Sequence, residues 1–130
     1  MGGRLPVDGK KVQEFRITLG TFERDRLDTL ITGLTVKNVA NPFVALISDI
    51  SALTFLFTAY MTYVYGEPVT NFIADKYDNV SDFVKTVKEI ENAKEIGILT
   101  IKNAVPFGLG FLPSIISDAI NLINNQENNV

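Results

Sequence analysis

The chain of 130 residues has no cysteine, no histidine and no tryptophan. Without cysteine it can form neither disulfide bonds nor thiolate metal sites. Without histidine it lacks the usual general base and the commonest metal ligand of proteins. Its net charge of −3 gives no overall positive field that would attract nucleic acid. We therefore expect a protein that is not an enzyme, that holds no cofactor or metal, and that does not bind nucleic acid specifically.

Catalytic sequence motifs are missing as well. The chain contains neither a phosphate-binding P-loop nor the nucleophile elbow of hydrolases. The glycines of segment 108–110 are too few for a dinucleotide fingerprint. Asp75, Asp78 and Asp82 have a spacing that suggests a cation site, but no EF-hand pattern follows them. A solvated acidic turn explains these three carboxylates better.

One apolar stretch dominates the sequence. It comprises the 23 residues from Phe43 to Tyr65 and carries a single charge, Asp49. As an α-helix it would be about 34 Å long, which suffices to cross a hydrocarbon layer of about 30 Å. Pro42 suits the first position of a helix, and Gly66 suits a left-handed residue at its end. We therefore expect one long hydrophobic helix here.

The apolar side chains of this stretch go all the way round the predicted helix. Such a helix is either a membrane span or the centre of a large core. Because a chain of 130 residues has little room to bury it on every side, we expect a transmembrane helix. Tyr60, Tyr63 and Tyr65 near its end fit the aromatic belt of a membrane interface.

The alternative is that the stretch forms the central helix of a small helical bundle. A row of small hydroxyl side chains supports this alternative, because a row at helical spacing can mark a half-exposed side. Small hydroxyl residues also occur where helices meet within membranes, so the row does not decide between the two. The row consists of Ser48, Ser51, Thr54, Thr58 and Thr62.

Residues 98–123 form a second apolar segment, which prolines and glycines interrupt. We expect a loop followed by a helix over about 113–124, and it stays open whether the segment crosses a bilayer. Ionisable residues within a membrane are functional candidates by default. The candidate polar site is therefore Asp49, Lys102 and Asp118. The alternative for Asp49 is that it lies near the positive end of its helix, which stabilises a carboxylate.

The remaining segments have shorter patterns. Alternation of apolar and polar residues over 12–19 predicts a half-buried strand. Apolar residues at helical spacing predict helices over about 22–34, within 68–77 and over about 81–96.

Two arginines are candidates for contact with a phosphate or a lipid headgroup. Arg24 and Arg26 alternate with Glu23 and Asp25 at the start of a predicted helix. Exposed ion pairs within this mixed-charge run are the alternative explanation, because such pairs are common and individually weak.

Together these patterns predict a small, mainly α-helical protein with one long transmembrane helix, a second broken apolar segment and a short N-terminal strand. We divide the chain into four parts. They are an arm with the strand and an amphipathic helix, the long hydrophobic helix, the polar connecting helices, and the second apolar segment with its polar tail. The corresponding residues are 1–41, 42–66, 67–97 and 98–130.

The function that fits these features is that of a non-enzymatic, membrane-associated structural subunit of a larger assembly, for example a virion protein in contact with lipid. Its partners would be a lipid bilayer and other subunits, of this chain or of another. The excess of Lys and Arg before the long stretch would place the N-terminus on the cytoplasmic or interior side. Two alternatives stay open: a small pore-forming, holin-like membrane protein, and a soluble helical adaptor whose long helix is buried among partner subunits.

Overall fold

The computed structural model describes residues 5–33, 51–96 and 112–124, and these ranges are mainly helical. The prediction of a mainly α protein is confirmed, and the described ranges contain no strand. The helices are α1 (Gly9–Arg16), α2 (Thr21–Gly33), α4 (Ser51–Tyr65), α5 (Glu67–Lys76), α6 (Ser81–Glu89) and α8 (Leu112–Asn124), with the 3₁₀ helix η1 (Asp78–Val80) before α6.

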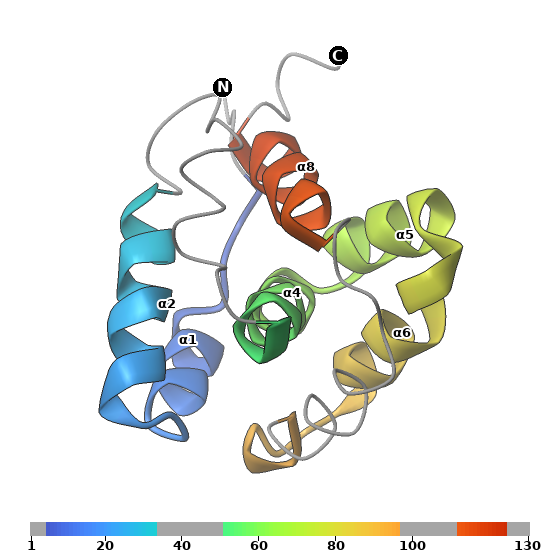
Figure 1. Ribbon diagram of the computed structural model, residues 1–130. Helices are drawn as coiled ribbons and strands as arrows, with labels where there is room; N and C mark the ends of the chain where they lie inside the picture. The colour runs from blue at the N-terminus through green and yellow to red at the C-terminus, as the bar shows by residue number, and fades with distance from the viewer. Residues whose placement is uncertain (1–4, 34–50, 97–111, 125–130) are drawn as a thin grey trace.

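Helix α4 lies at the centre of the molecule. Figure 1 looks along it, and the other helices surround it. Helices α1, α5, α6 and α8 all contact α4. The ten consecutive side chains from Phe55 to Val64 are each no more than 6 % exposed in the single chain. The expectation that so short a chain cannot bury this helix is therefore wrong, because four short helices cover it from different sides.

The predicted transmembrane helix is also wrong. The described residues of α4, Ser51–Tyr65, are packed against four other helices of the same chain. No helix within the described ranges combines the length and the hydropathy that crossing a membrane requires. The predicted location in a cellular or virion membrane is corrected accordingly. Residues 43–50 and 98–111 of the two apolar segments lie outside the described part of the chain.

The predicted strand over 12–19 is wrong, because helix α1 occupies most of this segment. Asp8 begins the helix: its carboxylate accepts hydrogen bonds from the backbone N–H groups of Lys10 and Lys11, at 3.1 and 3.2 Å. Phe15 is fully buried against the rings of Tyr60 and Tyr63, at centroid distances of 5.4 and 6.2 Å. The apparent alternation arises because apolar residues continue past the end of the helix into the next turn.

Two threonines of the predicted polar row are fully buried instead of half-exposed. Thr58 and Thr62 of α4 are both 0 % exposed. The hydroxyl of Thr62 donates to the backbone carbonyls of Thr58 and Ala59, at 3.2 and 3.1 Å. Because a threonine hydroxyl can bond to the preceding turn of its own helix, it can be buried without a partner elsewhere. At Thr58 and Thr62 the row therefore does not mark a solvent-facing side.

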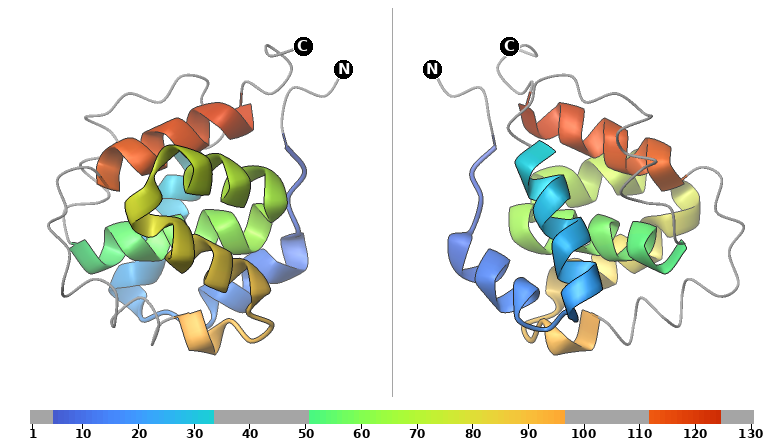
Figure 2. Two further views of the ribbon diagram at one scale, coloured as in Figure 1. Left: turned by 90° about the vertical axis from the view of Figure 1, so that its right-hand side faces the viewer. Right: turned by 60° about the vertical axis from the view of Figure 1, so that its left-hand side comes forward.

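A single glycine separates α4 from α5, as expected from the sequence. Gly66 has a φ of 77°, which L-residues with side chains rarely adopt, and α4 ends at the preceding residue. Pro68 then lies in the first turn of α5, where its missing N–H costs no hydrogen bond. The resulting sharp corner lets α5 fold back towards the helices around α4, as the left view of Figure 2 shows.

The remaining helices match the predictions closely, except for the end of α6. The predicted helix 81–96 ends at Glu89, and Ile90 is extended. The side chain of Asn92 then accepts a hydrogen bond from the backbone N–H of Lys94 and starts a new helical turn. The predicted apolar sides of α2, α6 and α8 do face the core. Their buried members include Leu27, Leu30, Phe83, Val84, Val87, Ile115, Ile116, Ala119, Ile120 and Ile123.

Candidate functional site

The turn between α1 and α2 exposes large apolar side chains. We call residues Ile17 to Phe22 the α1–α2 corner. Ile17 is 72 % exposed and Phe22 is 47 % exposed. Among the described residues, Val7 is the other large hydrophobic residue that is exposed to this degree, at 49 %. Single exposed apolar residues are common on protein surfaces, so the corner acquires meaning only from what lies next to it.

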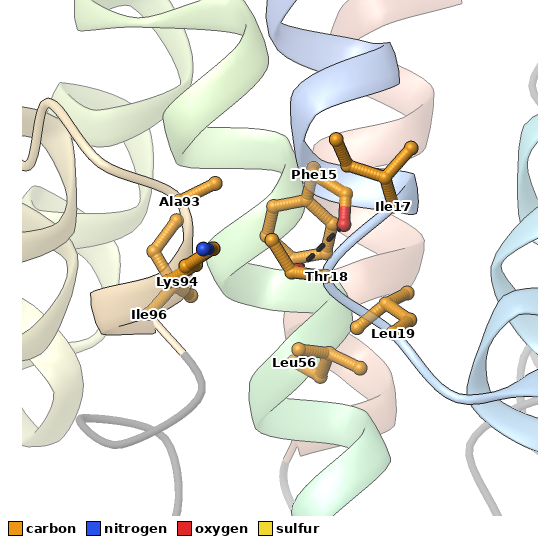
Figure 3. A pocket seen from close by; sticks show the side chains of 8 residues that line it. All are labelled: Phe15, Ile17, Thr18, Leu19, Leu56, Ala93, Lys94 and Ile96. Carbon is orange, nitrogen blue, oxygen red and sulfur yellow. Dashed lines mark hydrogen bonds between the residues drawn. The ribbon is translucent and has the colours of Figure 1, made fainter.

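A cleft of about 310 Å³ lies beside the corner. In Figure 3, Ile17 and Leu19 lie on one side of the Phe15 ring, and Ala93, Lys94 and Ile96 lie on the other. The eight residues that line it are Phe15, Ile17, Thr18, Leu19, Leu56, Ala93, Lys94 and Ile96.

The cleft is apolar at its base and polar at its edge. Phe15, Leu56 and Ile96 are at most 6 % exposed, whereas the Lys94 side chain lies on the surface. The hydroxyl of Thr18 already donates to the carbonyl of Phe15, at 2.7 Å. The base of the cleft therefore offers apolar contact to a partner side chain, and its edge offers polar groups such as Lys94.

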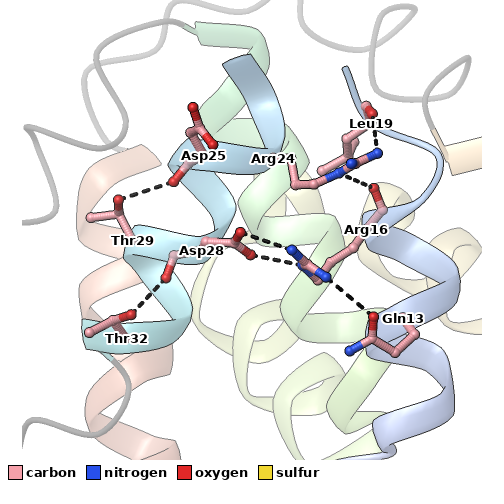
Figure 4. Close-up of polar contacts among 8 residues, drawn as sticks. All are labelled: Gln13, Arg16, Leu19, Arg24, Asp25, Asp28, Thr29 and Thr32. Carbon is pink, nitrogen blue, oxygen red and sulfur yellow. Dashed lines mark hydrogen bonds and ion pairs between the residues drawn. The ribbon is translucent and has the colours of Figure 1, made fainter. Parts of the chain in front are cut away.

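A network of arginine contacts holds the corner in place. Arg16 of α1 forms a two-pronged ion pair with Asp28 of α2, with Nε–Oδ1 and Nη2–Oδ2 distances of 2.8 and 3.0 Å. The hydrogen bond from Arg16 holds the pKa of Asp28 below its usual value. Arg24 donates to the backbone carbonyls of Arg16 and Leu19, at 3.1 and 3.0 Å. Figure 4 shows how these contacts connect the end of α1 to α2.

The two arginines proposed for phosphate or headgroup contact both have partners within the chain. Arg24 binds the backbone carbonyls of the corner. The guanidinium of Arg26 lies over the ring of Phe22, 5.1 Å from its centroid. The arrangement assigns Arg24 a part in shaping the corner, and contact with a phosphate stays a prediction.

Of the three residues of the predicted polar site, the structure describes one. Asp118 of α8 accepts hydrogen bonds from Lys76 and Tyr77, at 2.7 and 2.5 Å. These contacts fasten α8 to the end of α5. Asp49 and Lys102 lie outside the described residues, so the pairing of Asp49 with Lys102 or Asp118 stays a prediction.

The contacts at Asp118 shift the pKa values of two groups, the Asp118 carboxyl and the Tyr77 phenol. Burial raises the pKa of Asp118, but the hydrogen bonds from Lys76 and Tyr77 outweigh it and leave the pKa below the ordinary value. Burial, and then the bond to Asp118, raise the pKa of Tyr77 to about 12. A phenol that is harder to ionise is a poor nucleophile, and we interpret this cluster as a structural contact.

The sequence pattern missed the corner because it assigned Ile17 and Leu19 to a buried strand face. Asp8, which precedes Lys10 and Lys11, is the signal that could have revealed α1, since aspartate is among the best N-cap residues. A helix that starts there ends near Arg16 and leaves Ile17 outside it. The cleft itself has no sequence signal, because its two sides are more than seventy residues apart.

The cleft beside the corner adjoins Ile17, the most exposed large apolar side chain among the described residues, and we take it as the candidate site. Within the described ranges, no group of three or more acidic residues could hold a metal ion. Comparison of the chain with protein-family models, with curated proteins and with solved structures finds no match.

Proposed function

We propose that this protein is a non-enzymatic helical adaptor that acts by binding another polypeptide at the α1–α2 corner. The observation that carries the proposal is Ile17: an isoleucine that is 72 % exposed at the edge of a cleft of about 310 Å³ with an apolar base. Exposing such a side chain to water is unfavourable, and covering it together with the cleft would remove apolar surface from water.

The geometry of the corner supports binding rather than catalysis. Interface residues that contribute most to affinity are anchors that fill apolar recesses surrounded by polar groups. Here the cleft lies between residues 15–19 and residues 93–96, and the contacts of Arg16 and Arg24 hold the first of these segments against α2. A surface that is already ordered before binding loses less conformational entropy on association.

The structure changes one part of the adaptor hypothesis. The sequence suggested that partner subunits bury the long helix, whereas the chain itself buries residues 55–64. A partner is therefore not needed to shield residues 55–64. In the revised hypothesis the partner contacts the surface at Ile17 and Phe22. Helix α4 supports this surface from inside, because Phe15 packs against its tyrosines.

Site-specific photo-crosslinking in the cells that produce the protein tests the proposal. A photoreactive amino acid replaces Ile17 in one variant and Lys85 in a control, because Lys85 is an exposed residue of α6 that does not line the cleft. We expect a discrete crosslinked protein product from position 17 and none from position 85. The absence of any product at position 17, or the same products at both positions, would count against the adaptor.

A further inference from the structure

We propose that Asn79 is the acceptor of an N-linked sugar chain. Asn79, Val80 and Ser81 form the pattern that enzymes require when they attach sugars to asparagine, namely asparagine, any residue except proline, and then serine or threonine. We call these three residues the acceptor triplet. No other asparagine of the sequence is followed two positions later by a serine or a threonine. The triplet is separate from the α1–α2 corner, so this inference does not rest on the proposed function.

The acceptor triplet lies on the surface, in η1 and the first residue of α6. Val80 is fully buried and fastens the turn to the core, whereas Asn79 is exposed and Ser81 is half-buried. Asp78 and Asp82 on either side of the triplet are exposed as well, so polar surface surrounds the attachment point. In Figure 1 this turn lies at the edge of the molecule, on the far side of α4 from α1 and α2. A sugar chain on Asn79 would therefore extend into solvent and leave the corner accessible.

The polar side chains of the triplet take no part in holding the fold. Asparagine and serine are among the best residues for capping the start of a helix, yet the cap position of α6 is occupied by Val80, whose side chain cannot accept a hydrogen bond. Within the part of the chain that the structure describes, neither the Asn79 amide nor the Ser81 hydroxyl forms a hydrogen bond. Asn92 differs, because its side chain accepts a hydrogen bond and starts a helical turn. Both groups that a sugar-transferring enzyme recognises are therefore available.

The reaction is the transfer of a sugar chain from a lipid diphosphate to the amide of Asn79. A bond forms between the amide nitrogen and the anomeric carbon of the first sugar, and the bond between that carbon and the phosphate oxygen breaks. The lipid diphosphate leaves with the electron pair, and the nitrogen gives up one proton to a base of the enzyme. The product is still an amide, so the reaction needs no oxidant or reductant and adds no charge to the side chain.

The proposal also concerns the route that the chain takes. Sugars on lipid diphosphates are transferred on the outer side of the cytoplasmic membrane or inside the secretory pathway. A modified Asn79 would thus mean that this turn has been on that side. Because the sequence has no cysteine, disulfide bonds give no independent indication of the compartment.

Peptide mass spectrometry of the protein isolated from the cells that produce it tests the proposal. Trypsin cleaves after Lys76 and Lys85 and releases residues 77–85, in which Asn79 is the only asparagine. We expect this peptide to carry added sugar mass, and the intact protein to exceed 14.4 kDa by at least that mass. Asn79→Gln and Ser81→Ala should both lose the added mass, whereas Ser81→Thr should keep it because threonine also completes the pattern.

Asn71→Gln is the matched control, since Asn71 is an exposed asparagine of the neighbouring helix α5 that is not part of such a pattern. This variant should keep the added mass. Circular dichroism verifies that all variants retain their helices, which we expect because the Asn79 and Ser81 side chains hold no contacts of the fold. An unmodified peptide 77–85 from the unaltered protein would overturn the proposal, as would added mass that persists in Asn79→Gln.

Discussion

Helix α4 and the α1–α2 corner are both rich in apolar residues, yet their surroundings are opposite. The side chains of Phe55 to Val64 are at most 6 % exposed, whereas Ile17 is 72 % exposed. The apolar character of α4 made it look like a membrane helix, and that of the corner made it look like a buried strand. The comparison teaches that hydropathy identifies which residues avoid water but not which neighbours remove them from it.

The neighbours explain the difference. Helix α4 has α1, α5, α6 and α8 packed against it, and it gains rings such as Phe83, whose centroid lies 5.2 Å from that of Phe55. Ile17 follows the last turn of α1, at a point where the chain reverses and α2 leads away. Nothing that the structure describes covers it to a comparable degree.

Replacing one phenylalanine in each region should produce the largest difference. Phe55→Ala leaves a cavity in the core and should lower the free energy of unfolding by about 3–5 kcal/mol. Phe22→Ala removes a ring that is already 47 % exposed and should lower it by less than about 1 kcal/mol. Urea denaturation of both variants measures the two values. Similar losses for the two would mean that the regions do not differ in burial as described.

The ion pair that fastens α8 to the end of α5 should have an intermediate effect. Asp118→Asn weakens the contacts to Lys76 and Tyr77 and should lower the free energy of unfolding by about 1–2 kcal/mol, since the pair is partly exposed. The matched control is Glu67→Gln, which weakens the exposed pair with Lys88 and should cost less than about 0.5 kcal/mol. Chemical denaturation at neutral pH checks both.

The pH dependence of unfolding adds a second readout for Asp118. Its pKa is lower in the folded protein than in the unfolded chain, so the folded state binds this proton less readily. The stabilisation is present above the unfolded pKa of about 4 and is lost as the pH falls through the folded value. The acid loss of stability should therefore be shallower in Asp118→Asn. An unchanged acid dependence would contradict the inferred role of this carboxylate.

The smallest effect concerns the arginine that shapes the corner. Arg24→Met removes the donors to the carbonyls of Arg16 and Leu19 and should lower the free energy of unfolding by about 1 kcal/mol. Lys85→Met, at an exposed position of α6, should change it by less than about 0.5 kcal/mol. Arg24→Met should also reduce crosslinking from Ile17. Full crosslinking in this variant would show that Arg24 does not shape the surface.

Much of the helical structure could be predicted because its signals are local. Gly66 and Pro68 mark the break between α4 and α5, and the apolar spacing of α2 and α8 identifies their buried sides. The failures also have local causes. At α1, apolar and polar residues alternate past the end of the helix, and this pattern predicted a strand despite the N-cap Asp8. At α6, the helix ends early because Ile90 has extended backbone and Asn92 caps a new helical turn.

The candidate site was less predictable, because the cleft joins residues 15–19 to residues 93–96 through a contact with Leu56. Arg24 was a candidate for phosphate contact, with exposed ion pairs as the alternative, and its contacts with the carbonyls of the corner were not foreseen. Asp118 was a candidate for a polar site, and its partners Lys76 and Tyr77 were not foreseen. Long-range pairs of this kind have no periodicity in the sequence.

The sequence by itself determined the absence of cysteine and histidine chemistry, the mainly helical class, and most of the helix boundaries, because these depend on residue type and on neighbours within a few positions. Only the tertiary structure decided where the apolar residues lie. Four short helices close around α4 and remove it from water, whereas the reversal after α1 leaves Ile17 beside an open cleft. The physical reason is that burial depends on which distant segments meet, and apolar side chains have no preference between lipid, the chain's own core and the surface of a partner.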